Sequence, residues 1–216
     1  NYFTKEGFGA LVARWGADVP VELSTPVKRI DWSAKQIVVE TARGNIRCSR
    51  VIITVSTGVL AFGDIEFFPE LPPEYTESFF DLPMGMLTKI PVEISGSRLG
   101  LKPFEDLLIE RPARHDMYFL CFPFDLDLMV GFVGGDFAWE LSVAGEHAAR
   151  DFAIDRLVGI FGSEARKSVG RSMMTNWGAE PTVRGAYAAA RPGRAEARDI
   201  LSKPIDARIH FAGEAL

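Results

Sequence analysis

The chain has 216 residues, 47% of them hydrophobic and 25% charged, a composition typical of a globular protein with a sizeable core in one domain or two. Its formal net charge of −5, without any cluster of lysine and arginine, argues against a nucleic-acid-binding protein. No apolar run is long enough to cross a bilayer and no signal-peptide pattern opens the chain, so the sequence predicts a soluble protein, of unknown compartment, that is not a membrane protein.

The cysteines and histidines do not indicate a metal site. Cys48 and Cys121 lie in apolar, strand-like surroundings without CxxC spacing, which favours two buried thiols over a disulfide or a metal pair. His115, His147 and His210 share no ligand spacing. The sequence therefore predicts no metal.

A short amphipathic helix opens the chain. Phe8, Leu11, Val12 and Trp15 follow the i, i+3, i+4, i+7 spacing of one helix face, and Gly16 ends the pattern.

Strand patterns follow this helix. Alternating or β-branched runs predict strands over 21–23, 27–32, 36–41 and 46–55, with a turn at 43–45. The end of the last run, 51–55, is apolar on both faces, as in a buried parallel strand.

The character of the sequence changes after Ala61. Residues 67–73 contain three prolines and are predicted to be a linker, and 74–82 are predicted to be a helix with two prolines near its first turn. A strand over 88–94 follows, and Pro91 restricts it to a sheet edge or a bulge.

The remaining pattern contains a hairpin, a helix and two strands. Residues 117–123 and 128–133 predict the hairpin, 146–161 the clearest helix, and 169–175 a strand that leads to Trp177. Near the end, 208–212 is a short apolar run followed by Gly213 and Glu214. A strand, a small residue and an acid at a βα turn commonly place backbone N–H groups against a phosphate or ribose.

Several of these residues together resemble one family. The sequence is similar to the flavin-containing amine oxidases, which include monoamine and polyamine oxidases and flavin histone demethylases. The likeness rests on Trp177, Pro181, Gly185, Tyr187, Gly193 and Phe211 to Glu214, on Gly85, Lys89 and Ile90, and on Thr54, Gly58 and Leu60.

The resemblance implies an α+β fold with a mixed β-sheet substrate domain and flanking helices, plus partial strands of a Rossmann-like FAD-binding domain. On this basis residues 1–60 are expected in the FAD-binding part. Residues 61–189 are expected in the substrate-binding domain, and 190–216 back in the FAD-binding part.

The resemblance also implies roles for three side chains. Lys89 matches a catalytic lysine that holds a water against the flavin N5 edge, although position alone would make it a solvated surface lysine. Tyr187 matches an aromatic wall in front of the flavin, where an aromatic face can hold an amine without hydrogen-bonding it. Trp177 matches a tryptophan near the flavin, a position that packing alone would also explain.

Five residues match cofactor contacts of the family. Val27 matches a valine that meets the adenine, and Thr54 and Ser56 belong to a turn beside the cofactor. Ordinary strand packing is the alternative reading of Val27 and Thr54. Ser56 stands where the family usually has proline, which predicts a turn with a less restricted φ. Gly213 and Glu214 match residues on the phosphate or ribose side, where we expect the carboxylate to accept a hydrogen bond.

The implied activity is that of an FAD-dependent amine oxidase. A hydride passes from the amine α-carbon to flavin N5, water hydrolyses the imine, and oxygen yields peroxide. Ala186 stands where the mitochondrial monoamine oxidases carry a flavin-linking cysteine, so the FAD is expected to be non-covalent. The expected partner is a small-molecule amine, and the sequence specifies neither which amine nor the oligomeric state.

The chain also departs from the family. It contains neither the GxGxxG turn nor the glycine-rich segment that follows the Phe-Ala-Gly-Glu motif in the family, which predicts a fragment that binds FAD weakly or not at all and does not turn over. Two alternatives stay open. One is a non-catalytic binding or scaffold module with this fold, and the other is a related flavoprotein, such as a desaturase or porphyrinogen oxidase, that acts on a non-amine.

Overall fold

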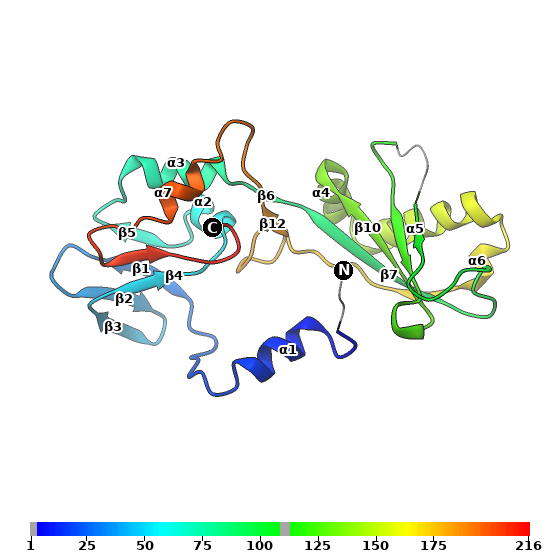
Figure 1. Cartoon of the computed structure of the whole chain (residues 1–216), viewed down its shortest axis with the longest axis horizontal. Coiled ribbons are helices and arrows are strands. Elements are labelled where there is room, and N and C mark those ends of the chain that lie inside the picture. The colour runs from blue at the N-terminus through cyan, green and yellow to red at the C-terminus, as the bar shows by residue number, and fades with distance from the viewer. Residues whose placement is uncertain (1–3, 109–112) are drawn as a thin grey trace.

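The computed structural model describes residues 4–108 and 113–216, which form two lobes joined by a narrow connection (Figure 1). The first lobe, at the left of Figure 1, consists of residues 27–82 and 190–211, and the second lobe consists of residues 87–108 and 113–172. The chain returns from the second lobe to the first through residues 173–189.

A four-stranded sheet and a separate pair of parallel strands form the framework of the first lobe. The sheet has the order β3-β2-β1-β5, with β1 and β5 parallel, and the separate pair is β4 with β13. The elements are β1 (Val27–Asp31), β2 (Ile37–Thr41), β3 (Gly44–Cys48), β4 (Val51–Ile53), α2 (Thr57–Phe62), β5 (Glu66–Phe68), α3 (Pro73–Asp81), α7 (Ala197–Leu201) and β13 (Ile209–Phe211).

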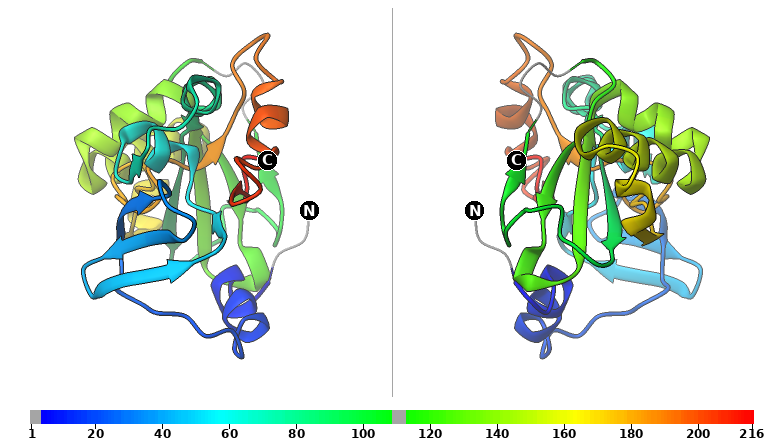
Figure 2. Two further views of the ribbon diagram at one scale, coloured as in Figure 1. Left: turned by 90° about the vertical axis from the view of Figure 1, so that its left-hand side faces the viewer. Right: turned by 90° about the vertical axis from the view of Figure 1, so that its right-hand side faces the viewer.

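An antiparallel sheet of order β11-β7-β10-β9-β8 forms the framework of the second lobe, with helices against one face (Figure 2). Its elements are β7 (Leu87–Ile94), β8 (Asp106–Leu107), β9 (Tyr118–Cys121), a 3₁₀ turn (Pro123–Asp125), β10 (Leu128–Gly134), α4 (Gly135–Ala144), α5 (Glu146–Phe161), α6 (Ala165–Ser168) and β11 (Val169–Ser172). Between the lobes, β6 (Met84–Gly85) pairs with β12 (Tyr187–Ala188). These sheets and helices confirm the predicted α+β class.

Each lobe has its own buried core. In the second lobe, alternate residues of β7 such as Ile90 and Val92 face α4 and α5, and Leu157 of α5 is fully buried among them. The first-lobe core joins β1 and β2 to α3, α7 and β13, and includes Phe79 and Ile209. The two clusters share no member among the described residues, so each lobe packs largely by itself.

The packing boundary differs from the predicted boundary at residue 60. Leu71, Tyr75, Phe79 and Leu82 are all buried in the core of the first lobe, although the sequence assigns them to the substrate-binding domain. The run read as a link contains β5, which pairs with β1 and continues the first-lobe sheet. The chain therefore crosses at β6; the division into an FAD-binding part and a substrate-binding domain stays a prediction.

Pro91 lies in an interior strand. The prediction of an edge position is wrong, because β7 pairs with β10 on one side and with β11 on the other. The alternative prediction of a bulge agrees with the register between β7 and β11, which shifts between Val169 and Ser172, next to Pro91. On the side that faces β11, the Pro91 carbonyl accepts a hydrogen bond from the N–H of Met173. The proline has no N–H to donate, so the second hydrogen bond of a regular pair is not formed there.

Two other strand predictions change. Residues 21–23 do not form a strand, and Val21 and Leu23 are exposed. The run 46–55 divides into β3 and β4, which belong to different sheets. As predicted, β4 is a parallel strand that pairs with β13, but Ile52 at its centre is 67% exposed, so the described residues do not cover both faces of β4.

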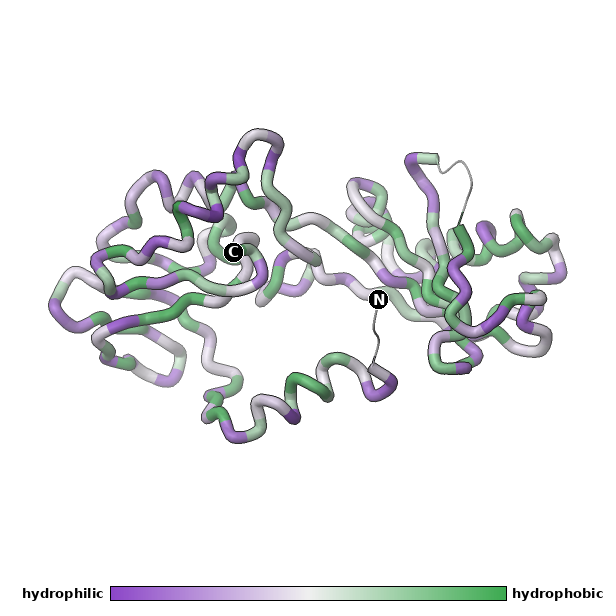
Figure 3. The backbone as a smooth tube through the Cα atoms, viewed as in Figure 1, coloured by the Kyte–Doolittle hydropathy of each residue, from purple (hydrophilic) through white to green (hydrophobic). Residues whose placement is uncertain are grey.

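The predicted first helix forms, but its apolar face is not packed. Helix α1 (Phe8–Trp15) lies apart from both lobes, and Figure 3 shows its hydrophobic positions in green. Phe8 is 73% exposed and Trp15 is 88% exposed. The periodicity predicted the helix correctly, and the partner for its apolar face is not provided by the described residues.

The remaining predictions agree closely with the structure. α3, α5 and the hairpin of β9 and β10 form as predicted, and α4 is a helix that the pattern did not indicate. Cys121 is buried and Cys48 half-buried, both with free thiols, and burial raises the pKa of the Cys121 thiol to about 11. Among residues 4–108 and 113–216, no helix has the length and hydrophobicity to cross a membrane.

Candidate functional site

Four of the predicted cofactor residues follow the two parallel strands of the first lobe. Val51 pairs with Ile209, and the register continues to Ile53 opposite Phe211. Thr54 and Ser56 come after β4, and Gly213 and Glu214 come after β13. The carboxyl ends of parallel strands meet at one edge of a sheet, so the structure brings these four residues together, as ligand sites in α/β proteins require.

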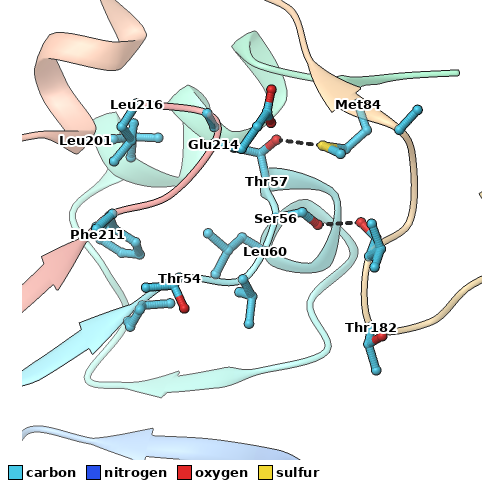
Figure 4. Close-up of a pocket in the computed structure, with 16 residues that line it drawn as sticks. Thr54, Ser56, Thr57, Leu60, Met84, Thr182, Leu201, Phe211, Glu214 and Leu216 are labelled. Atoms are coloured by element: carbon cyan, nitrogen blue, oxygen red, sulfur yellow. Dashed lines mark hydrogen bonds between the residues drawn. The ribbon is translucent and has the colours of Figure 1, made fainter. Parts of the chain in front are cut away.

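A cavity of about 260 Å³ opens at this edge (Figure 4). Thr54, Ser56 and Glu214 line it from the two strand ends, and Met84 lines it from the connection between the lobes. The Glu214 carboxylate accepts hydrogen bonds from the N–H of Ala188, at 3.0 and 3.2 Å from its two oxygens. The expected hydrogen bond to this carboxylate is thus present, and its donor is the residue that follows Tyr187.

A second cavity, of about 600 Å³, lies against the same turn and is lined mainly by apolar side chains. Val27 lines it from β1, Ile52 from β4 and Pro181 from the returning segment. Thr54 contributes to both cavities, which places Val27 near the other four predicted cofactor residues.

Ser56 keeps the backbone angle that a proline would impose. Its φ is −62°, close to the proline value, because the residue caps the N-terminus of α2. Its hydroxyl accepts from the N–H of Val59 at 3.2 Å and donates to the carbonyl of Val183. Two hydrogen bonds thus hold Ser56 at the angle that a proline ring would impose, and the less restricted φ of the turn stays a prediction.

The residues at the strand ends fit part of the flavin nucleotide that the resemblance implies. Gly213 has a φ of +133°, and a Cβ there would lie 3.4 Å from the Thr54 carbonyl oxygen. A glycine leaves the backbone open to close approach, which suits a phosphate or ribose. The apolar second cavity suits the flat ring of a base.

Lys89 lies in a row of three side chains on the face of the second-lobe sheet that α4 and α5 do not cover. The register pairs Lys89 with Phe132 and Phe132 with Tyr118, across β7, β10 and β9. The Lys89 Nζ lies 5.9 Å from the centre of the Phe132 ring, and the Phe132 and Tyr118 rings stack at 4.7 Å. The lysine is exposed, and its backbone is held by Thr175 at 2.9 Å.

Tyr187 lies on the same face as Lys89. It pairs with Gly85, and its ring approaches so closely that a Cβ on Gly85 would lie 3.2 Å from Cε2. Gly85 and Lys89 alternate along the strand with the buried Met86 and Thr88, so they share the opposite face. Gly85 and Lys89 are four residues apart, which corresponds to about 13 Å along an extended chain.

Trp177 lies on the returning segment, 46% exposed, and its carbonyl accepts from the N–H of Gly185 at 3.0 Å. Lys89, Trp177 and Tyr187 are not among the residues that line the two cavities. The predicted site residues thus form two neighbouring sets. The first set lies at the cavities and strand ends, and the second set, Lys89, Trp177 and Tyr187, lies outside the cavities. The two sets are joined where the Glu214 carboxylate accepts from the N–H of Ala188.

Sequence reasoning missed Phe132, Tyr118 and Met84. The first two could have been found by pairing the predicted hairpin residue by residue, because cross-strand neighbours follow from the register. No local pattern indicated Met84, whose side chain reaches the cavity from the connection between lobes.

Comparison with known proteins supports one family. The family model described as "Flavin containing amine oxidoreductase" matches residues 1–216. Lysine-specific histone demethylase 1 homolog 1 of Oryza sativa subsp. japonica is 27% identical, over 99% of this chain and 26% of that protein. Lysine-specific histone demethylase 2 of Homo sapiens is 21% identical, over 97% of this chain and 27% of that protein.

A solved structure has the same fold. Cyclohexylamine oxidase from Brevibacterium oxydans IH-35A superposes with a TM-score of 0.76 at 22% identity, over 96% of this chain and 47% of that chain. The chain therefore spans about a quarter of the length of these curated relatives and about half of that structure.

Proposed function

Because the chain belongs to the flavin containing amine oxidoreductase family, we propose that it supplies one wall of the catalytic site of an FAD-dependent oxidase of small-molecule amines. The observation that carries this proposal is the pairing of Tyr187 with Gly85, a residue that strand alternation assigns to the same face as Lys89. An oxidase of this kind needs a polar group and an aromatic surface that face the same ligand.

When bound, FAD would supply the redox chemistry, namely the removal of a hydride from the α-carbon of the amine and the reduction of oxygen to peroxide. In this chain, Gly213, Thr54 and Ser56 would hold its nucleotide part at the strand ends. Ala186 offers no thiol, so we propose that the FAD is bound non-covalently.

The side chains of the second set would handle the substrate. The exposed Tyr187 ring offers a face on which an amine can lie, and Trp177 adds a second aromatic surface nearby. The Lys89 Nζ donates hydrogen bonds and would hold a water or pass a proton at that atom. Phe132 restricts where this ammonium can lie, because the two groups are direct cross-strand neighbours.

Lys89→Met in the full-length protein tests the proposal. Amine-dependent peroxide release should fall by about 10²- to 10⁴-fold, the usual contribution of a positioned proton-transfer group. The flavin absorbance should remain, because Lys89 is not among the residues that line the cavities at the strand ends. Lys167→Met is the matched control, since this exposed lysine of α6 pairs with Glu164, the residue before the helix, and should leave the rate unchanged.

Two results would contradict the proposal. Full peroxide release from the Lys89→Met variant would remove the lysine from the reaction. A flavin that is reduced by other substrates and never by amines would identify a flavoprotein of another class, and a protein that binds no flavin would favour a scaffold module.

A further inference from the structure

Helix α2 holds the returning segment at three points. At its N-terminus, the Ser56 hydroxyl donates to the carbonyl of Val183. In its first turn, Gly58 lies so close that a Cβ would be 2.9 Å from the Arg184 carbonyl oxygen. Beyond its C-terminus, Asp64 forms an ion pair with Arg184. We call these contacts of Ser56, Gly58 and Asp64 with Val183 and Arg184 the α2 clasp.

The clasp includes a two-pronged ion pair of Arg184 and Asp64. The guanidinium donates from Nε to one carboxylate oxygen and from a terminal nitrogen to the other, the latter at 2.9 Å. It also lies over the Phe62 ring, 3.5 Å from its centre. The hydrogen bond to Asp64 raises the pKa of Arg184 above its already high ordinary value. A two-pronged pair stacked on an aromatic ring fixes orientation as well as distance.

Arg184 also has an unusual backbone. Its φ is +58°, a left-handed value that non-glycine residues adopt at a cost in free energy. The side chain is only 23% exposed, and its contacts with Asp64 and Phe62 hold the residue in this conformation. Strain that is held in this way often occurs where a neighbouring group must be positioned.

The neighbours of Arg184 carry the predicted aromatic residues. The N–H of Gly185 donates to the Trp177 carbonyl at 3.0 Å, and the N–H of Ala186 donates to Gly85 at 2.9 Å. Gly185 has no room for a side chain, because a Cβ would lie 2.3 Å from Cβ of Met84. A displacement of Arg184 would therefore be passed to Trp177 and Tyr187.

We infer that Asp64 and Arg184 are positioning residues that set where Trp177 and Tyr187 lie relative to the turn at Thr54 to Ser56. This role rests on the proposed function, because it assigns the two aromatic residues to substrate and that turn to the cofactor. Helix α2 begins directly after the turn, and the α2 clasp holds the segment that leads to Tyr187. One short helix thus links the two sets of site residues.

The first experiment measures position without catalysis. In the chain with ¹³C-labelled tyrosine and tryptophan, the ring signals of Tyr187 and Trp177 should shift or broaden in Arg184→Gln and in the nearly isosteric Asp64→Asn. The Tyr118 signal should not change. The exchange Arg184→Asp with Asp64→Arg should restore at least half of the lost shift.

The matched control is the pair of Arg171 and Glu93, which joins β11 to β7 through two similar hydrogen bonds. Arg171→Gln should leave the Tyr187 signal unchanged. The inference is overturned if Arg184→Gln and Asp64→Asn both leave Tyr187 and Trp177 unchanged, or if Arg171→Gln changes them equally.

The second experiment measures turnover in the full-length protein. Asp64→Asn should lower kcat for an amine by about 10- to 100-fold with a smaller change in KM. The reason is that misplacing a substrate-positioning group by about 1 Å can lower the rate by about 100-fold. An unchanged kcat would overturn the positioning role. If the unmodified protein oxidises no amine, the proposed function fails, while the tyrosine signals still decide whether the clasp sets the position of Tyr187.

Discussion

The first lobe is assembled from two segments that lie far apart in the sequence, 27–82 and 190–211, whereas the described part of the second lobe, 87–108 and 113–172, lies between them. β4 pairs with β13 near the C-terminal end of the sequence, and β1 pairs with β5 although β2, β3, β4 and α2 lie between them in the chain. In the second lobe, β9 and β10 are joined by a short turn, and α4 and α5 follow β10 directly.

The two sets of site residues follow this difference. The cofactor-side residues at the ends of β4 and β13 come together only when a long loop closes, which costs more conformational entropy than local pairing. In the row of Lys89, Phe132 and Tyr118, the pair of Phe132 and Tyr118 lies within one hairpin, and Lys89 joins it through the pairing of β7 with β10 in the same lobe. Substitutions in the second lobe should therefore affect mainly that lobe, whereas substitutions at the connection between the lobes should affect both sets of site residues.

The largest expected effect comes from a matched pair of core substitutions. Phe119→Ala in the second lobe and Phe79→Ala in the first each remove a phenylalanine that is almost completely buried. Each should cost about 3–5 kcal/mol of unfolding free energy, because the cavity cannot fully collapse. Amide hydrogen exchange should show the loss of protection mainly in the substituted lobe. Equal loss of protection in both lobes would show that they unfold as one cooperative unit, and it would contradict the view that each lobe packs by itself.

A smaller effect is expected at the connection. Gly58→Ala would place a Cβ 2.8 Å from Cγ of Met84 and 2.9 Å from the Arg184 carbonyl oxygen. The forced shift should cost about 1–3 kcal/mol in chemical denaturation. Gly159→Ala is the control, because a Cβ in this part of α5 meets nothing within 4 Å, and it should stabilise by about 0.5–1 kcal/mol. A Gly58→Ala variant as stable as the unmodified chain would argue against the close contact.

The smallest effect is expected in the row that contains Lys89. A double-mutant cycle of Phe132→Leu and Tyr118→Leu should give a coupling of about 0.5–1.5 kcal/mol, the range for stacked aromatic pairs. The fold of the first lobe should not respond, because the pair lies within β9 and β10. Absence of coupling would mean that the row does not act as a unit and that Phe132 does not depend on Tyr118 for its position.

The sequence by itself determined most of the elements with a strong local signal. The spacing of apolar residues predicted α1 and α5, prolines at the first turn predicted α3, and a turn between two apolar runs predicted the hairpin of β9 and β10. These predictions hold because helix periodicity and turn geometry depend on residues that are close in the chain. The resemblance likewise identified the family from short motifs.

Only the tertiary structure decided which elements meet. It placed Phe79 in the first lobe, put Pro91 inside a sheet, left the apolar face of α1 uncovered and joined Arg184 to Asp64. Each of these outcomes depends on pairing or packing between segments distant in sequence, for which the local pattern carries no signal. The same holds for the shared face of Lys89 and Tyr187, because it follows from the register of β12 against β6 and not from the spacing of the two residues.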